Sequence, residues 1–254
     1  MRPGFLVWLF LPLLVTPALA REVKVGIGRS ISPYVIPDEL RGLEYDVAKE
    51  ALAVEGHRLV PEFLPLAREV KAFEGGQIDA MLTQRPGGLP DATYSDVYVV
   101  YRNYAITLES RNLAINGLAD LADKSVLAFQ NAALYLGPEF KAVTAANPNY
   151  REDPKQQAQP TLLFLDRVDV VVADSKIFNW FANQSEVKAK VDTTQPLRYH
   201  PLFPPTEYRV AFRDAGLRDA FNRGLARLRA DGQYDRIVAR YSSGMVREPA
   251  AGSR

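Results

Sequence analysis

Cysteine is absent from this chain of 254 residues, and histidine occurs only twice. The absence of cysteine excludes disulfides, thiol nucleophiles and thiolate metal ligands. His57 and His200 lie far apart in the chain and have no partner at metal-ligand spacing, so we expect no metal site. No Gly-x-Ser-x-Gly pattern is present, and no third glycine completes a dinucleotide motif after Gly26 and Gly28. We therefore expect no cofactor.

An excess of charge of either sign is also missing. The chain carries 31 basic and 30 acidic side chains, and removing residues 1–20 takes away one basic residue and no acid. A chain without net charge lacks the clustered positive charge of a nucleic-acid surface or a surface for anionic membranes. We expect no nucleic-acid partner.

Long apolar runs are missing everywhere except at the N-terminus. Arg2 supplies a positive charge, residues 5–15 are almost wholly apolar, and residues 18–20 fit a small-x-small cleavage site. The run is shorter than the roughly 20 residues that span a bilayer. We predict a signal peptide over residues 1–20, cleavage after Ala20 and a soluble protein in the periplasm. Since no cysteine follows the run, we expect no lipid anchor.

A near-repeat is the most informative feature that the chain does contain. Residues 77–83 read Gln-Ile-Asp-Ala-Met-Leu-Thr, and residues 167–174 read Arg-Val-Asp-Val-Val-Val-Ala-Asp. Both stretches follow segments with helical spacing, so the pattern predicts two similar α/β units. Two such units make a cleft, with ligand beyond the carboxyl ends of the strands. Asp79 and Asp169 precede their strands, and we interpret them as turn residues rather than ligand contacts.

The hydrophobic periodicity predicts alternating strands and helices in both units. In the first unit we expect strands at 23–27, 59–64 and 78–83, with helices at 43–52 and 67–73. In the second unit we expect strands at 125–129 and 168–173, with a helical turn at 118–121 and helices at 133–146, 156–165 and 175–182. A β-rich run at 97–108 and a strand at 208–212 would connect the units, and helices at 217–230 and 234–241 would end the fold. This alternation implies mostly parallel sheets with helices on their faces.

Several short stretches occur in an order known from one protein family. They are residues 32–34 with 42–47, 76–80, 94–98, 118–121 ahead of 125–128, 168–174, and 208–212 with 230–237. The ordered set covers about residues 22 to 243 and resembles the periplasmic solute-binding proteins of family 3, which include the polar amino-acid receptors of ABC transporters. The chain looks like a divergent member.

The resemblance implies the two-lobed periplasmic binding protein fold of type II, with two hinge crossings. We place lobe 1 at residues 21–108 plus 206–245, lobe 2 at 109–205, and a disordered tail at 246–254. The resemblance further implies a receptor that captures a small polar solute by hinge closure and presents it to an inner-membrane ABC transporter permease. We expect a monomer without enzymatic activity.

The ligand-binding residues implied by the resemblance are matched only in part. In the amino-acid receptors an arginine pairs with the ligand carboxylate, an acid of the second lobe pairs with the ammonium group, and an aromatic residue covers the side chain. Asp174 falls at the position of the acid, Tyr34 at the aromatic residue, and Thr83 at the end of its strand. The family arginine is absent after Thr83, and Arg85 is the nearest replacement. Tyr98 is a further candidate, with core packing as its alternative.

The second carboxylate-binding feature of the family is also altered. A glycine-serine/threonine turn is replaced by residues 130–133, in which Asn131 could cap a helix, bind ligand or do both. Asp174 could likewise cap the helix that follows it. These departures make a standard α-amino acid a weaker expectation than the fold. Glu44 and Asp46 are interpreted as solvated acids in the first turn of a helix.

Two other functions stay open. One is a catalytic relative on the same scaffold, like the cyclohexadienyl dehydratases, which would need a general acid inside the cleft. The sequence shows no clear acid for this besides Asp174. The other is a sensory protein that reports the ligand to a membrane partner.

Overall fold

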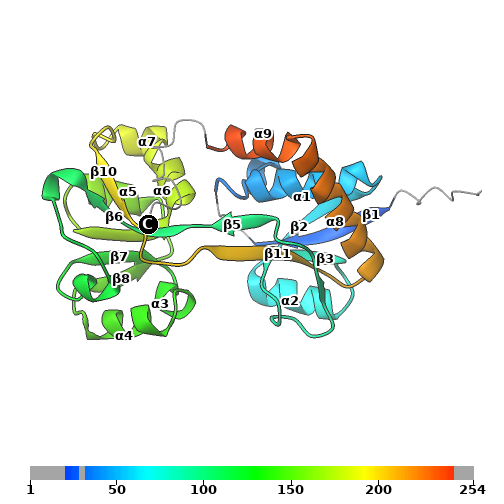
Figure 1. The fold of residues 1–254 in the computed structure, drawn as a ribbon, viewed down its shortest axis with the longest axis horizontal. Coiled ribbons are helices and arrows are strands. Elements are labelled where there is room, and N and C mark those ends of the chain that lie inside the picture. The colour runs from blue at the N-terminus through cyan, green and yellow to red at the C-terminus, as the bar shows by residue number, and fades with distance from the viewer. Residues whose placement is uncertain (1–20, 29–31, 243–254) are drawn as a thin grey trace, which may run out of the picture.

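The computed structural model describes residues 21–28 and 32–242. The predicted signal peptide at 1–20 and the predicted tail at 246–254 lie outside the described residues. The described residues form two sheets with helices on their faces, arranged as two halves along the long axis of the molecule (Figure 1). Within these ranges no helix is long and apolar enough to cross a membrane.

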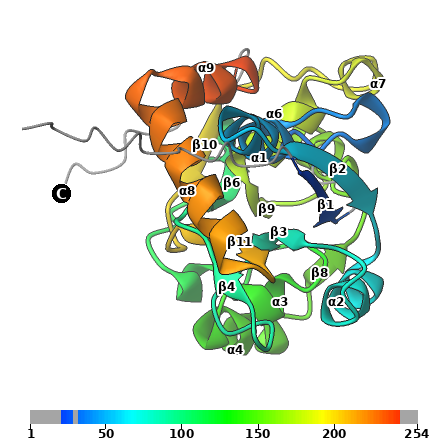
Figure 2. The same cartoon turned by 90° about the vertical axis from the view of Figure 1, so that its right-hand side faces the viewer.

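The first half, called the first lobe below, is built on a six-stranded sheet. Its strands are β1 (Glu22–Ile27), β2 (Arg58–Phe63), β3 (Ala80–Gln84), β4 (Thr93–Tyr94), β5 (Val99–Tyr101) and β11 (Thr206–Phe212). The order is β2-β1-β3-β11-β4, and β5 also pairs with β11. β1 is parallel to β2 and β3, whereas β11 is antiparallel to its neighbours. Figure 2 shows α1 (Leu43–Val54), α8 (Ala215–Ala230) and α9 (Gln233–Arg240) on one side of the sheet and α2 (Leu66–Glu74) on the other.

The second half, called the second lobe, is built on a five-stranded sheet. Its order is β10 (Leu197–His200), β6 (Asn103–Leu108), β9 (Val170–Asp174), β7 (Val126–Phe129) and β8 (Tyr150–Asp153). β7 is parallel to β8 and β9, while β6 is antiparallel to β9 and β10. The helices are α3 (Ala132–Tyr135), α4 (Pro138–Ala146), α5 (Ala158–Phe164), α6 (Ser175–Ala182) and α7 (Ser185–Lys188). Short 3-10 turns lie at Pro37–Glu39, Glu109–Arg111 and Leu118–Leu121.

The apolar run of β9 explains why helices cover both faces of the second sheet. Val171 and Ala173 belong to the cluster that contains side chains of α5 and α6, while Val170 and Val172 belong to the cluster with side chains of α3 and α4. Successive side chains of a strand point to opposite faces, so a continuous apolar strand must be buried on both.

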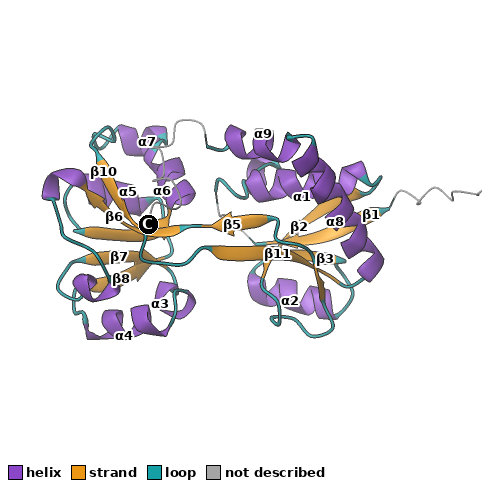
Figure 3. Cartoon of the chain, viewed as in Figure 1, coloured by secondary structure: helices purple, strands orange, loops and turns teal. Residues whose placement is uncertain are grey.

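Two strands cross between the lobes side by side (Figure 3). β5 continues through Arg102 into β6, and β11 returns antiparallel to β5, with Thr206 opposite Tyr101. The predicted two crossings are therefore present. Residues 103–108, which we expected in lobe 1, form β6 of the second sheet, because the chain enters that sheet directly after Arg102.

Three local predictions need correction. The helix expected at 133–146 is two helices, because Gly137 has a φ of 101° and Pro138 begins α4. β8 and β10 were not predicted, since both are four-residue strands without a long apolar run. Each sheet is mixed rather than mostly parallel, because the crossing strands join the parallel strands in antiparallel orientation.

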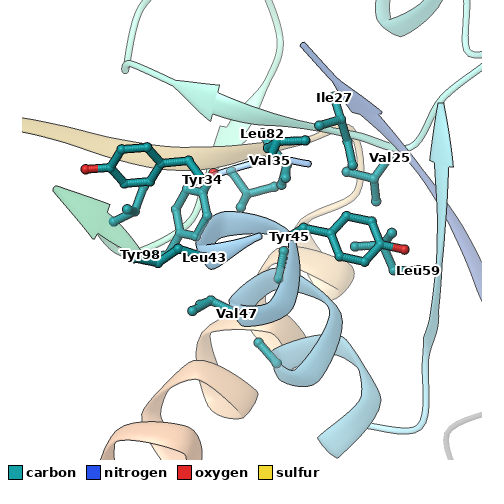
Figure 4. Packing of buried hydrophobic residues seen from close by; sticks show 14 of the residues in the cluster. Val25, Ile27, Tyr34, Val35, Leu43, Tyr45, Val47, Leu59, Leu82 and Tyr98 are labelled. Atoms are coloured by element: carbon teal, nitrogen blue, oxygen red, sulfur yellow. The ribbon is translucent and has the colours of Figure 1, made fainter. Parts of the chain in front are cut away.

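The core of the first lobe extends to the crossing strands. Figure 4 shows its cluster around α1, with Tyr34 and Tyr98 at one end and Tyr45 at the other. α1 and α8 pack closely because Gly224 has no side chain, and a Cβ at this position would lie 1.9 Å from the Ala51 carbonyl oxygen. A rigid base of this kind holds the residues that face the second lobe.

The aspartates of the near-repeat play equivalent parts in the two lobes. The Asp79 carboxylate accepts a hydrogen bond from the backbone N–H of Lys24 at 2.9 Å, and the Asp169 carboxylate accepts one from the backbone N–H of Ser125 at 2.9 Å. Both carboxylates also pair with an arginine, Asp79 with Arg21 and Asp169 with Arg111. Each aspartate thus ties its turn to the start of the neighbouring strand, which agrees with the interpretation as turn residues.

Candidate functional site

A cavity of about 450 Å³ lies between the lobes, next to the crossing strands. Residues of both lobes and both crossings line it, among them Glu69, Thr83, Arg85, Tyr101, Phe129, Asp174 and Tyr208. The carboxyl ends of β3 and β9, the two strands of the near-repeat, both reach its wall. This is the position at which open α/β sheets bind ligands.

Asp174 lies on the cavity wall and is already fully hydrogen-bonded by the protein. Its side chain caps α6 by accepting from the backbone N–H groups of Lys176 and Ile177, at 2.9 and 3.1 Å. The backbone N–H of Arg102 donates to it at 2.8 Å, and the Tyr34 hydroxyl donates at 3.1 Å. Burial raises the pKa of Asp174 to about 6, against the lowering effect of these hydrogen bonds. Asp174 therefore caps α6, as the alternative interpretation predicted, and it also lines the cavity.

Tyr34 supports Asp174 from the first lobe. Its side chain is 1 % exposed, and its ring stacks on Tyr101 with 3.8 Å between the ring centroids. Tyr34 is not among the residues that line the cavity, whereas Tyr101 is. In this arrangement Tyr101, which the sequence analysis did not single out, presents the aromatic surface to the cavity.

Thr83 lies on the wall in an unusual backbone conformation. Its φ is +58°, which is rare for a β-branched residue. The pairing of β3 with β11 shifts register here, because Met81 faces Ala211 and Gln84 faces Arg209. One extra residue in β3 forms a bulge, a device that re-aims side chains next to functional sites.

The conformation of Thr83 is held by two buried residues behind it. Its N–H donates to the Tyr98 hydroxyl at 3.1 Å, and its hydroxyl donates to the Glu44 carboxylate at 2.6 Å. The Tyr98 hydroxyl donates to the same Glu44 oxygen at 2.8 Å. Tyr98 is fully buried and packs edge-on against Phe221, so it supports the wall from the core.

The interpretation of Glu44 and Asp46 as solvated acids is wrong. Glu44 is fully buried and Asp46 is 8 % exposed. Burial raises the pKa of Glu44, against the lowering effect of the hydroxyl groups of Thr83, Tyr101 and Tyr98. Asp46 accepts from the Tyr241 hydroxyl at 2.7 Å. Helical spacing could have indicated the burial of Glu44, because it precedes the buried Ala48 by four positions.

Glu69 is an acidic residue on the cavity wall that the sequence analysis did not single out. It lies on α2, is 2 % exposed and lines the cavity. Burial, helped by the nearby negative charge of Glu44, raises the pKa of Glu69 to about 7. Its spacing of three and four residues from the buried Ala72 and Phe73 was the available signal. The expectation that the cleft holds no clear acid besides Asp174 is therefore wrong.

Arg85 and Asn131, the two remaining candidates, differ in position. Arg85 is exposed and lines the cavity. None of the other described residues that line the cavity is basic. Asn131 is not among the lining residues, and its φ is +64°. The backbone N–H groups of Asn131 and Ala133 donate to the carboxylate of Glu152, at 2.6 and 2.9 Å. In the turn at 130–133, a side chain of the protein therefore occupies these anion-binding groups.

The described residues form two lobes joined by two crossing strands, with a cavity between the lobes. The sequence pattern of one family fits this architecture. The pattern of the bacterial extracellular solute-binding proteins, family 3, matches residues 23–244. The chain belongs to this family. The predicted family and the predicted fold of type II are both confirmed.

Several solved structures have a similar fold over most of their length. A histidine kinase sensor domain with similarity to periplasmic binding proteins has a TM-score of 0.66 at 19% identity, with 91% of this chain and 99% of that chain covered. An ancestral arginine-binding protein bound to arginine has a TM-score of 0.64 at 21% identity, with 87% and 97% covered. The ancestral amino acid-binding protein AncCDT-1, a precursor of cyclohexadienyl dehydratase, has a TM-score of 0.62 at 18% identity, with 87% and 95% covered.

At these identities the likeness shows the fold alone. No curated protein sequence matches the chain. The family membership and the cavity together support a solute-binding role. What this family member binds must be argued from its own residues.

Proposed function

We propose that this protein is a periplasmic receptor that captures a small polar solute, an amino acid or a related molecule, and presents it to an ABC transporter permease. The carrying observation is that the wall of the cavity comes from both lobes and both crossing strands. Any hinge motion about the crossing strands must then open or close the cavity. The structure of the ancestral arginine-binding protein with arginine shows that this fold can hold a small polar solute.

The lining residues support the capture of a polar solute. Tyr101 and Tyr208 offer aromatic surface, and their rings lie edge to face with 4.9 Å between the centroids. Thr83, Arg85 and Asp174 offer polar groups at the ends of the two strands. Closure removes water from these groups, which strengthens each electrostatic contact with a solute.

Thermal-shift screening of the mature chain, residues 21–254, tests the proposal. The set of solutes covers amino acids, amines and small carboxylates. A solute at a hundred times its Kd stabilises the folded state by about 2.7 kcal/mol, which raises the Tm by several degrees. Small-angle X-ray scattering should then show a smaller radius of gyration with the solute than without it. Absence of a response to every solute would contradict the proposal.

A lyase on the same scaffold is the second candidate, and one observation favours it. Glu69 lies on the cavity wall with a pKa raised to about 7, the range suited to a general acid near neutral pH. Mass spectrometry of the stabilising solute after prolonged incubation separates the two functions. A receptor returns the solute unchanged, whereas a lyase converts it.

A further inference from the structure

Glu69 is a buried carboxylate on the cavity wall with an oxygen that lacks a hydrogen-bond partner among the described residues. One of its oxygens, Oε1, is inaccessible to solvent and makes no hydrogen bond with any residue in the described ranges. Burying an ionisable group without a partner is unfavourable, so buried polar groups are nearly always hydrogen-bonded. Within the described residues, no hydrogen bond compensates for the burial of this oxygen.

The space for this carboxylate is created by a glycine in the adjacent strand. A Cβ at Gly26 of β1 would lie 2.7 Å from Cγ of Glu69 and 3.0 Å from its Oε1. Any larger residue at position 26 would displace the glutamate side chain. The glutamate therefore occupies a site that the neighbouring backbone leaves open for it.

The other buried groups near Glu69 add negative charge and unused hydrogen-bonding capacity. Glu44 is fully buried, and its Oε1 also has no hydrogen-bond partner among the described residues. The Tyr101 hydroxyl, on the cavity wall, faces the buried Glu44 carboxylate without forming a hydrogen bond of good geometry within the described residues. Asp174 adds a third acid, and the basic residue of the described lining, Arg85, is exposed. Among the described residues, no basic side chain forms an ion pair with Glu69, although Lys176 acts electrostatically on Asp174.

We propose that Glu69 binds a side-chain cation of the solute, an ammonium or guanidinium group distinct from the α-ammonium group of an amino acid, and that this positive charge defines the solute class. This inference rests on the receptor function proposed above. A carboxylate on the solute is not required, because Glu152 already occupies the backbone N–H groups of Asn131 and Ala133. If the solute also carries a carboxylate, Arg85 on the cavity wall is the residue that would bind it.

Two matched sets of solutes test the charge requirement. L-arginine, agmatine and L-citrulline form one set, and L-lysine, cadaverine and L-norleucine form the other. In each set the second compound lacks the carboxylate, and the third lacks the positive charge of the side chain. We expect the cationic members of at least one set to raise the Tm of the mature wild-type chain, with agmatine or cadaverine retaining the effect.

The variant Glu69→Gln then tests the residue itself. Loss of one charge-assisted hydrogen bond should weaken the affinity for the responding cation about 10- to 100-fold. Glu74→Gln is the matched control, because Glu74 lies on the same helix and is exposed. This control should bind like the wild type.

A pH profile of the wild type keeps the test decisive even if Glu69→Gln folds poorly. The glutamate must lose its proton to bind a cation, so affinity should rise as the pH increases from 6 to 8 around its pKa of about 7. Glu44 from α1 is the charged group that acts on Glu69. The titratable and charged groups that line the same cavity are Asp174 from β9, Tyr101 from β5, Tyr208 from β11, Tyr135 from α3 and Arg85 beyond β3. In Glu69→Gln the rise should be flattened.

The outcomes separate this inference from the proposed function. Binding of citrulline or norleucine as tight as that of the cations, an affinity of Glu69→Gln within threefold of wild type, or a flat wild-type profile would overturn the cation site and leave the receptor intact. No stabilisation by any amino acid, amine or carboxylate would overturn the receptor function and this inference with it.

Discussion

The hydroxyl of Tyr34 donates to both carboxylate oxygens of Asp174, at 3.2 and 3.1 Å. Tyr34 lies in the loop after β1 of the first lobe, and Asp174 ends β9 of the second lobe. This contact joins two residues 140 positions apart, across the crossing strands. It provides a direct hydrogen bond between the lobes next to the cavity.

Removing that hydroxyl should favour a more open molecule. A hydrogen bond to a charged group contributes about 1.5–3 kcal/mol, so Tyr34→Phe should shift the equilibrium between closed and open lobes about tenfold or more. The radius of gyration of the solute-free protein, measured by small-angle X-ray scattering, should increase. Tyr45→Phe is the control, because no hydrogen bond of the Tyr45 hydroxyl occurs within the described residues. Identical scattering from Tyr34→Phe and wild type would refute the role of the contact.

The hydroxyl of Thr83 should stabilise the fold through Glu44. Thr83→Val removes the donor at 2.6 Å and leaves a buried carboxylate with fewer partners. We expect the free energy of unfolding, measured by urea denaturation, to fall by about 1–3 kcal/mol. Thr83→Ser retains the hydroxyl and should stay within about 1 kcal/mol of the wild type. Equal losses in both variants would show that the hydrogen bond is not the cause.

The two aspartates of the near-repeat should affect stability and not binding. Asp79→Asn and Asp169→Asn weaken the hydrogen bonds to Lys24 and Ser125, so each should lower the free energy of unfolding by about 1–2 kcal/mol. Affinity for a stabilising solute, measured by calorimetry, should be unchanged. Asp38→Asn, at an exposed site, is the control for the chemical change. A large loss of affinity in either variant would place these turns in the binding site after all.

Stability of the solute-free protein should fall as the pH rises from about 4.5 to about 7. The pKa of Glu69 is raised from its ordinary value of 4.5 to about 7, so the folded state binds more protons than the unfolded state in this window. The stabilisation is fully present below the unfolded-state pKa and is lost as the pH rises through the folded-state pKa. Asp174, raised from 3.8 to about 6, acts in the same direction.

Comparison with Glu69→Gln isolates the part due to Glu69. The difference in Tm between the variant and the wild type should move in favour of the variant as the pH increases from 5 to 8. Differential scanning fluorimetry at several pH values measures it. A difference that is independent of pH would mean that Glu69 titrates normally.

The alternation of strands and helices could be predicted because it depends on local periodicity. The near-repeat located β3 and β9, since a short apolar run after a polar turn is typical of a buried strand. The division of the helix at Gly137 and Pro138 could also be predicted from the residue types, because a glycine followed by a proline typically ends one element and begins another. The four-residue strands β8 and β10 could not be found this way, because long-range pairing rather than local pattern makes them strands.

The sequence by itself determined the family, the two α/β units and the strand ends at Thr83 and Asp174, because these follow from residue order and hydrophobic spacing. Only the tertiary structure decided which polar groups of the cavity region have hydrogen-bond partners within the described residues. Asp174 and the turn at Asn131 are satisfied by distant residues, Tyr34 and Glu152, whereas Glu69 is buried without a partner. Helical spacing indicates which face of a helix is buried, but the hydrogen-bond partners of a buried group come from residues far apart in the chain, and only the packing brings these together.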